Sequence, residues 1–141
     1  MSITALCPFD ITEWDENPYG ESERGPKLAR TTVKKLFRGD LDGESSAEVL
    51  MCQADPGNLA LGAGYVASEV VEGSLHGRRG SFVMQHGALA GPDMEPTTFG
   101  QIVPGSGTGE LAGISGSVEI GRTAEGAHTL TLAYSLAESV G

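Results

Sequence analysis

Hydrophobic and polar residues alternate most clearly between Tyr65 and His86. Because successive side chains of a strand point to opposite faces of a sheet, this period of two predicts two strands. A tight turn at residues 76–79, which include Gly77, would join them into a β-hairpin. Each strand has one mainly apolar face, and the two faces carry Tyr65, Ala67, Glu69 and Val71 on the first strand and Phe82, Met84, His86 and Ala88 on the second.

One ionisable residue interrupts each of these apolar faces. A turn centred on Gly77 would place Glu69 opposite His86 and Val71 opposite Met84. A carboxylate would then lie beside an imidazole on a buried face. This is the clearest candidate for chemistry in the sequence.

Turn-forming residues and shorter alternating runs predict six further strands and the loops between them. The tetrapeptide at residues 55–58, Asp-Pro-Gly-Asn, is a strong turn signal because proline presets the second turn position. We also expect turns at residues 40–43 and 90–95, an exposed acidic loop at 15–27, and a glycine-rich loop at 104–116 with a helical turn at 108–112. The eight predicted strands cover residues 3–15, 28–38, 45–54, 59–71, 81–89, 96–103, 117–122 and 128–136.

Eight antiparallel strands with short connections favour an all-β fold, a single eight-stranded antiparallel β-barrel. We expect one domain that covers residues 1–141. The chain length fits one domain, and the 21 glycines agree with a structure rich in turns. A closed barrel removes the exposed strand edges that promote aggregation. A β-sandwich of the same strands is the alternative.

The first predicted strand contains a proline and the only tryptophan of the chain. Pro8 lacks an N–H group, which suggests a bulge or an edge position. Regular alternation places Phe9, Ile11 and Glu13 on one face. Trp14 would then point away from the core, under the acidic loop or at a subunit contact, since aromatic residues are enriched in interfaces.

The chain carries a net charge of −10, from 19 acidic and nine basic residues. Nucleic acids and anionic membrane surfaces both select basic proteins, so neither is an expected partner. Cys7 and Cys52 occur without CxxC or Cys/His metal spacing, which favours free, buried thiols and no metal site. No signal peptide and no membrane-spanning run are visible, and we expect a cytoplasmic protein.

Four segments of the sequence resemble a bacterial family, domain of unknown function 3224. They are ITEWDE at residues 11–16, GPKL at 25–28, GSFVMQH at 80–86 and PGSGTGELAG at 104–113. The glycine-rich segment, with Gly107, Thr108, Gly109, Leu111, Gly113 and Gly116, is also similar to part of the allene oxide cyclase and dirigent barrels.

The resemblance implies a small barrel of the allene-oxide-cyclase type and little about activity. Cyclases of that wider group fold a reactive, mostly apolar substrate inside the barrel, often without a metal or an organic cofactor. Only the glycine-rich segment matches them, so no catalytic residue is transferred to this chain. Fold analogy alone is a weak basis for function.

The candidate catalytic residues are Glu69 and His86. His86 could donate or accept a proton while Glu69 orients it or stabilises its imidazolium. The alternative is a satisfied polar pair that only fixes the register of the barrel. The candidate ligand-binding residues share the predicted inner faces or a strand end near the barrel mouth; they are Tyr65, Phe82, Met84, Leu130, Leu132, Tyr134 and Glu13.

These residues predict a barrel that binds a small apolar or amphipathic molecule. Cofactor-independent cyclisation or isomerisation could follow, because orientation and proton transfer together supply much of a rate enhancement. The alternative is a non-catalytic carrier, sensor or stress-related barrel with a filled core. A homodimer or another homo-oligomer is also expected. The deciding feature is an open cavity of roughly 300 Å³ or more.

Overall fold

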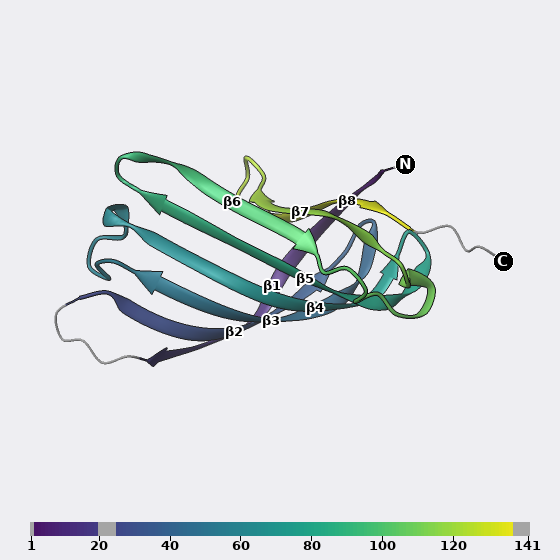
Figure 1. Cartoon of the computed structure of the whole chain (residues 1–141), viewed down its shortest axis with the longest axis horizontal. Coiled ribbons are helices and arrows are strands. Elements are labelled where there is room, and N and C mark those ends of the chain that lie inside the picture. Colours follow the sequence, from purple (N-terminus) through teal and green to yellow (C-terminus); the bar gives the residue numbers. More distant parts are fainter. Residues whose placement is uncertain (1, 20–24, 137–141) are drawn as a thin grey trace.

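Eight antiparallel strands form a closed ring in the computed structural model, which describes residues 2–19 and 25–136 (Figure 1). The strands follow one another around the ring in chain order, and β1 pairs with both β2 and β8. The predicted all-β antiparallel barrel is therefore confirmed, and a sandwich is excluded. The strands are β1 (Ile3–Tyr19), β2 (Lys27–Phe37), β3 (Leu41–Gln53), β4 (Ala63–Leu75), β5 (Arg78–Gly91), β6 (Met94–Ile102), β7 (Ser115–Arg122) and β8 (His128–Ser135).

The strands extend further than the sequence pattern indicates. β1 continues to Tyr19, into the predicted loop at 15–27, of which residues 20–24 lie outside the described part. β3 begins within the predicted turn at 40–43, and β5 and β6 both extend into the predicted turn at 90–95. Residues 59–61 form a short 3-10 turn, η1 (Leu59–Leu61), where the start of a strand was predicted. Turn-forming residues thus mark the connections but overstate their length.

The β4–β5 hairpin turns through two residues, His76 and Gly77. Their φ angles of 48° and 82° are both positive, as in the mirror-image turns that match the twist of a hairpin. Because the turn is this short, Glu69 pairs with Met84, and His86 pairs with Ala67. The predicted pairing of Glu69 with His86 is therefore wrong by two residues. An even shift leaves both side chains on the inner face.

A β-bulge in β1 reverses the predicted orientation of two side chains. Ile11 pairs with Lys35, but Glu13 already pairs with Lys34, so β1 contains one extra residue at this point. An extra residue turns every following side chain to the opposite face. Trp14 therefore lies on the inner side, whereas regular alternation had placed it away from the core.

The interior is filled at one end of the barrel. The residues buried there come from every strand and from the glycine-rich loop, which contains η2 (Gly109–Leu111). This loop packs against β5 so closely that a Cβ atom added to Gly80 would clash with the carbonyl oxygen of Thr108. The glycine-rich segment therefore closes the end of a barrel. The largest side chains of this core are Phe9, Phe37, Leu41, Leu75, Phe82, Met84, Ile102, Leu111, Ile114, Leu130, Leu132 and Tyr134.

The other end of the barrel holds a smaller core. It consists of Val33, Ala47, Val49 and Ala67, with half-buried side chains packed against it. In Figure 1, β6 and β7 diverge along their length, and Gln101 with Ser117 is the pairing recorded between them among the described residues. This end is therefore the more open one.

Several apolar residues lie on the outer surface of the barrel, on β3 to β6. Leu50, Val66, Leu89 and Phe99 are all exposed there and line a shallow outer depression. Homo-oligomerisation stays a prediction. No described helix is long and apolar enough to cross a membrane. Cys7 and Cys52 are both free thiols, as expected; Cys7 is buried and Cys52 is half-buried.

Candidate functional site

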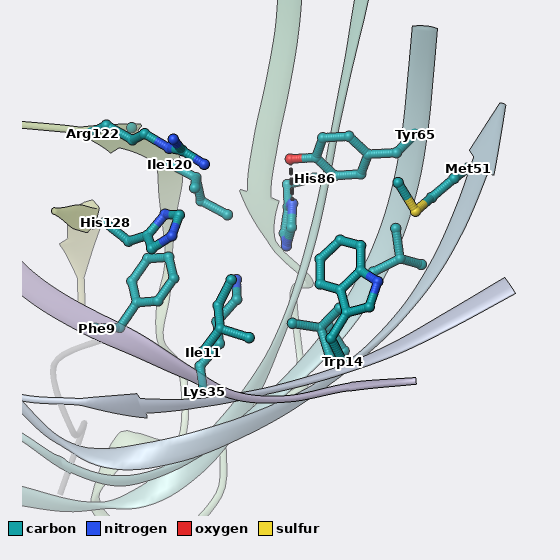
Figure 2. Close-up of a pocket in the computed structure, with 14 residues that line it drawn as sticks. Phe9, Ile11, Trp14, Lys35, Met51, Tyr65, His86, Ile120, Arg122 and His128 are labelled. Carbon is teal, nitrogen blue, oxygen red and sulfur yellow. Dashed lines mark hydrogen bonds between the residues drawn. The ribbon is translucent and has the colours of Figure 1, made fainter. Parts of the chain in front are cut away.

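A pocket of about 350 Å³ opens at the less filled end of the barrel (Figure 2). Strands β1, β2, β3, β4, β5, β7 and β8 all contribute to its wall. This volume is above the lower limit of roughly 300 Å³ that is expected for a small-molecule site. The lining residues are Phe9, Ile11, Trp14, Val33, Lys35, Ala47, Val49, Met51, Tyr65, His86, Ile120, Gly121, Arg122 and His128.

A hydrogen-bonded chain of three side chains leads from the pocket into the core. The Tyr65 hydroxyl lies 3.0 Å from Nδ1 of His86, and Nε2 of His86 lies 2.8 Å from Oε1 of Glu69. Tyr65 and His86 line the pocket, and Figure 2 shows the hydroxyl directed at the imidazole. Although Glu69 and His86 are not directly paired across the strands, the length of their side chains brings them together. Their catalytic role stays a prediction.

The carboxylate of Glu69 fixes the tautomer of His86. A carboxylate oxygen can only accept, so Nε2 of His86 carries the hydrogen that it donates to Glu69. When His86 is neutral, its Nδ1 is an acceptor, and the Tyr65 hydroxyl donates to it. When His86 is protonated, Nδ1 donates to the Tyr65 oxygen, whose own hydrogen then points elsewhere. The chain can therefore accommodate either neutral or protonated His86 without changing its heavy-atom positions.

Two more polar groups hold Glu69, which is fully buried. Nζ of Lys35 donates to Oε1 over 3.0 Å, and Oγ of Ser45 donates to Oε2 over 2.5 Å. Burial acts to raise the pKa of Glu69, but the His86 hydrogen bond, the Lys35 charge and the Ser45 hydrogen bond outweigh it. The pKa of Glu69 is consequently below its usual value, and the group is an anion at neutral pH.

Lys35 and Tyr65 respond to the same buried charge. Only 7% of Lys35 is exposed, and its ammonium lies 4.6 Å from the centre of the Phe9 ring, so aromatic and carboxylate contacts both hold it. Burial, followed by the negative charge of Glu69, raises the pKa of Tyr65. Tyr65 therefore keeps its hydroxyl hydrogen in the resting protein.

Most of the predicted ligand wall belongs to the filled core. Phe82, Met84, Leu130, Leu132 and Tyr134 are all buried in it, and none of them lines the pocket. Alternation correctly places them inside the barrel, but it does not distinguish a filled interior from a hollow one.

Of the two other predicted ligand-binding residues, Tyr65 lines the pocket, whereas Glu13 lies outside the barrel. The bulge in β1 directs it outward, where it is half exposed and 3.7 Å from Lys34. Glu13 is therefore not among the residues that line the pocket.

A second imidazole and hydroxyl meet at the filled end. Nδ1 of His76 lies 2.6 Å from the Tyr134 hydroxyl, and Nε2 of His76 lies 3.5 Å from Asp40. His76 is exposed, as expected for a residue in a turn, although its imidazole also contacts the Tyr134 hydroxyl. This group contributes no side chain to the pocket.

Several site residues were missed by the sequence analysis. Lys35 and Ser45 contact Glu69 from β2 and β3, and Arg122 and His128 lie at the pocket rim on β7 and β8. A signal for Lys35 existed, since it alternates with the buried Val33 and Phe37. Within the described residues, no group of three or more His, Cys, Asp or Glu could hold a metal ion.

Comparisons with known proteins identify the family. Residues 5–134 match the family described as "Protein of unknown function (DUF3224)". A crystal structure of a protein of unknown function from that family, from Shewanella oneidensis MR-1, is similar with a TM-score of 0.85 and 31% identity; the match covers 99% of this chain and 100% of the other. No match was found among curated proteins. The family match spans nearly the whole chain, and the chain therefore belongs to the DUF3224 family.

Proposed function

We propose that the pocket binds a small, largely apolar molecule and that Tyr65, His86 and Glu69 transfer a proton to or from it. The observation that carries this proposal is the hydroxyl–imidazole–carboxylate chain ending at the pocket wall, with links of 3.0 Å and 2.8 Å. The reaction class is cofactor-independent isomerisation or cyclisation, which needs positioning and acid–base groups only.

Proton transfer would use Tyr65 as the group that contacts the substrate. As a base, Tyr65 takes a proton from an acidic carbon while its own hydrogen moves to Nδ1 of His86. The imidazolium so formed is stabilised by Glu69, 2.8 Å away. As an acid, Tyr65 donates its hydrogen to a carbonyl or carbon while protonated His86 supplies the replacement. These two proton transfers are the reverse of each other, and an isomerase needs both because it removes a proton from one carbon and adds one to another.

The shape and lining of the pocket support binding. Its volume of about 350 Å³ lies within the usual range for small-molecule sites. Its wall is mostly apolar and includes Trp14 and Met51, with a few polar side chains, among them Tyr65 and His86. This is the usual composition of a site in which apolar contacts give affinity and a few polar groups give orientation.

A non-catalytic carrier or sensor is the second candidate. It is favoured by the hydrogen bonds that three side chains make to the carboxylate of Glu69. The same bonds would stabilise a buried charge that has only a structural role. The two candidates share the pocket and differ in whether His86 exchanges a proton with the bound molecule.

Two experiments test the proposal. Native mass spectrometry of protein purified from its own host should show a bound small molecule and give its mass. Next, a panel of β,γ-unsaturated ketones is followed by NMR in heavy water, where isomerisation moves a proton from the α-carbon to the γ-carbon.

The comparison in the second experiment is between His86→Gln and His76→Gln, the latter altering a similar imidazole–hydroxyl contact outside the pocket. We expect His86→Gln to slow deuterium uptake by about a hundredfold, and His76→Gln to leave it unchanged. Equal rates in the two folded variants would refute the acid–base role and leave the carrier.

A further inference from the structure

The charged residues that line the pocket are cationic, whereas the protein as a whole is acidic. The chain has 19 acidic and nine basic residues, yet the ionisable residues among the described lining are two histidines, one tyrosine, Lys35 and Arg122, without a carboxylate. Because salt screens charges beyond about 8 Å, these local groups decide what the pocket attracts. The overall negative charge has little influence at this distance.

The cationic groups of the pocket differ in whether they already have a partner. Lys35 is 3.0 Å from Glu69, so its charge is balanced inside the protein. Arg122 has no ion pair or side-chain hydrogen bond with the described residues. His128 stacks on Phe9 with a ring separation of 5.2 Å, and neither ring nitrogen has a described hydrogen-bond partner. Two unused donor groups therefore face the pocket.

The strand register places these two groups side by side. Arg122 and His128 are directly paired across β7 and β8, so their side chains project from the same face. Ile120 and Leu130, two residues further in, form the next pair on that face and pack in the core. An unpaired arginine at an inward-facing position, at the rim of a pocket, is well placed to meet a ligand.

The remaining wall suits an apolar body. Trp14 and Met51 lie across the pocket from Arg122 and His128 in Figure 2. Val33 and Val49 also line the pocket. A ligand that extends across the pocket therefore meets donors at one side, apolar surface at the other and the Tyr65 hydroxyl in its wall.

We propose that the ligand is an apolar monocarboxylate whose carboxylate is bound by Arg122 and His128. A guanidinium presents a planar pair of N–H donors that matches a carboxylate. A phosphate ester shares the negative charge but carries more of it and more acceptor oxygens. One guanidinium and one imidazole match the single negative charge and the two acceptor oxygens of a carboxylate. This inference rests on the proposed binding function, and names the class of molecule that the pocket selects.

Binding of phenylbutyrate, its neutral amide and phenylethyl phosphate tests the proposal. Trp14 is the only tryptophan of the chain and lines the pocket, so its fluorescence reports occupancy, and calorimetry gives the Kd independently. We expect phenylbutyrate to bind about tenfold more tightly than the amide, since a charge-assisted hydrogen bond at a partly exposed site has this effect. Added salt should weaken the acid and not the amide.

Two arginine variants separate the site from general charge. Arg122→Gln should remove the preference for the acid, whereas Arg79→Gln, which alters an exposed arginine outside the pocket, should keep it. Both positions are exposed, so both variants should fold, which circular dichroism checks.

Each other result has a defined meaning. Equal binding of acid and amide would overturn the carboxylate assignment and leave the pocket as a binding site. Tighter binding of the phosphate would overturn it in favour of a phosphorylated ligand. If none of the three probes changes Trp14 fluorescence or releases heat, the proposed binding function and the inference both fall.

Discussion

Replacing Glu69 by glutamine should destabilise the barrel strongly. The substitution keeps the size of the side chain and removes its charge, so the Lys35 ammonium, only 7% exposed, loses its counter-charge. Removing one partner of a buried ion pair costs about 3–5 kcal/mol. Because Lys35 also lines the pocket and can reach water there, we expect the lower limit, about 3 kcal/mol.

The assay is urea unfolding, followed by circular dichroism at neutral pH. A loss of about 3 kcal/mol corresponds to a fall in Tm of roughly 9 °C for a chain of this length. Glu48→Gln is the matched control, because Glu48 also pairs with a cation, Arg30, but both side chains are about half exposed or more. Exposed pairs contribute about 0–1 kcal/mol, so the control should unfold almost as the natural protein does.

A double variant separates the lost pair from other effects of the substitution. Lys35→Met removes the ammonium that Glu69→Gln leaves unbalanced, and methionine fills a similar space. The double variant should therefore be more stable than Glu69→Gln alone, because a buried pair can be replaced by apolar residues at little cost. A loss below about 1 kcal/mol for Glu69→Gln, or no recovery in the double variant, would refute this account of the buried cluster.

Three further predictions concern acid stability, packing and thiol reactivity. The pKa of Glu69 is lower in the folded protein than its unfolded value, near 4.5, so ionised Glu69 stabilises the fold at a pH above 4.5. This stability is lost as the pH falls from 4.5 through the folded pKa. Glu69→Gln should therefore flatten the acid limb of a curve of Tm against pH. Leu130→Ala should cost about 2–5 kcal/mol in urea unfolding and Met51→Ala under about 2 kcal/mol, because Leu130 is fully buried and Met51 borders the pocket; equal losses would contradict a barrel filled at one end only. Burial, then the charge of Asp40, raises the pKa of Cys7 to about 12, so a thiol-specific disulfide reagent should label Cys52 first, and faster labelling of Cys7 in peptide mass spectra would contradict the structure.

The fold was largely predictable because alternation is a local signal. The inward faces of β4 and β5 follow from residues two apart, and an error of two in the register left Glu69 and His86 on the correct face. The same rule failed in β1, where one extra residue reversed Glu13 and Trp14. No glycine or proline lies next to that bulge to indicate it, since Pro8 is several positions away.

The candidate site was only partly predictable because it depends on contacts between distant residues. Glu69 meets Lys35 34 positions earlier in the chain, and Ser45 24 positions earlier. Alternation places each of these inside but does not show which will meet. It also cannot tell whether large inward residues fill the barrel, which is why it predicts Phe82 and Met84 as pocket wall although both lie in the core.

The division of the barrel into a filled end and an open end has a consequence for how such a chain can change through evolution. Residues such as Leu130 and Phe82 hold the ring closed from one end, and substitutions there endanger folding. Residues such as Met51 and Arg122 contribute little to that core, so they can be exchanged while the ring persists. Relatives with the same backbone can thus line this end with different side chains, and a shared fold in this family need not mean a shared function.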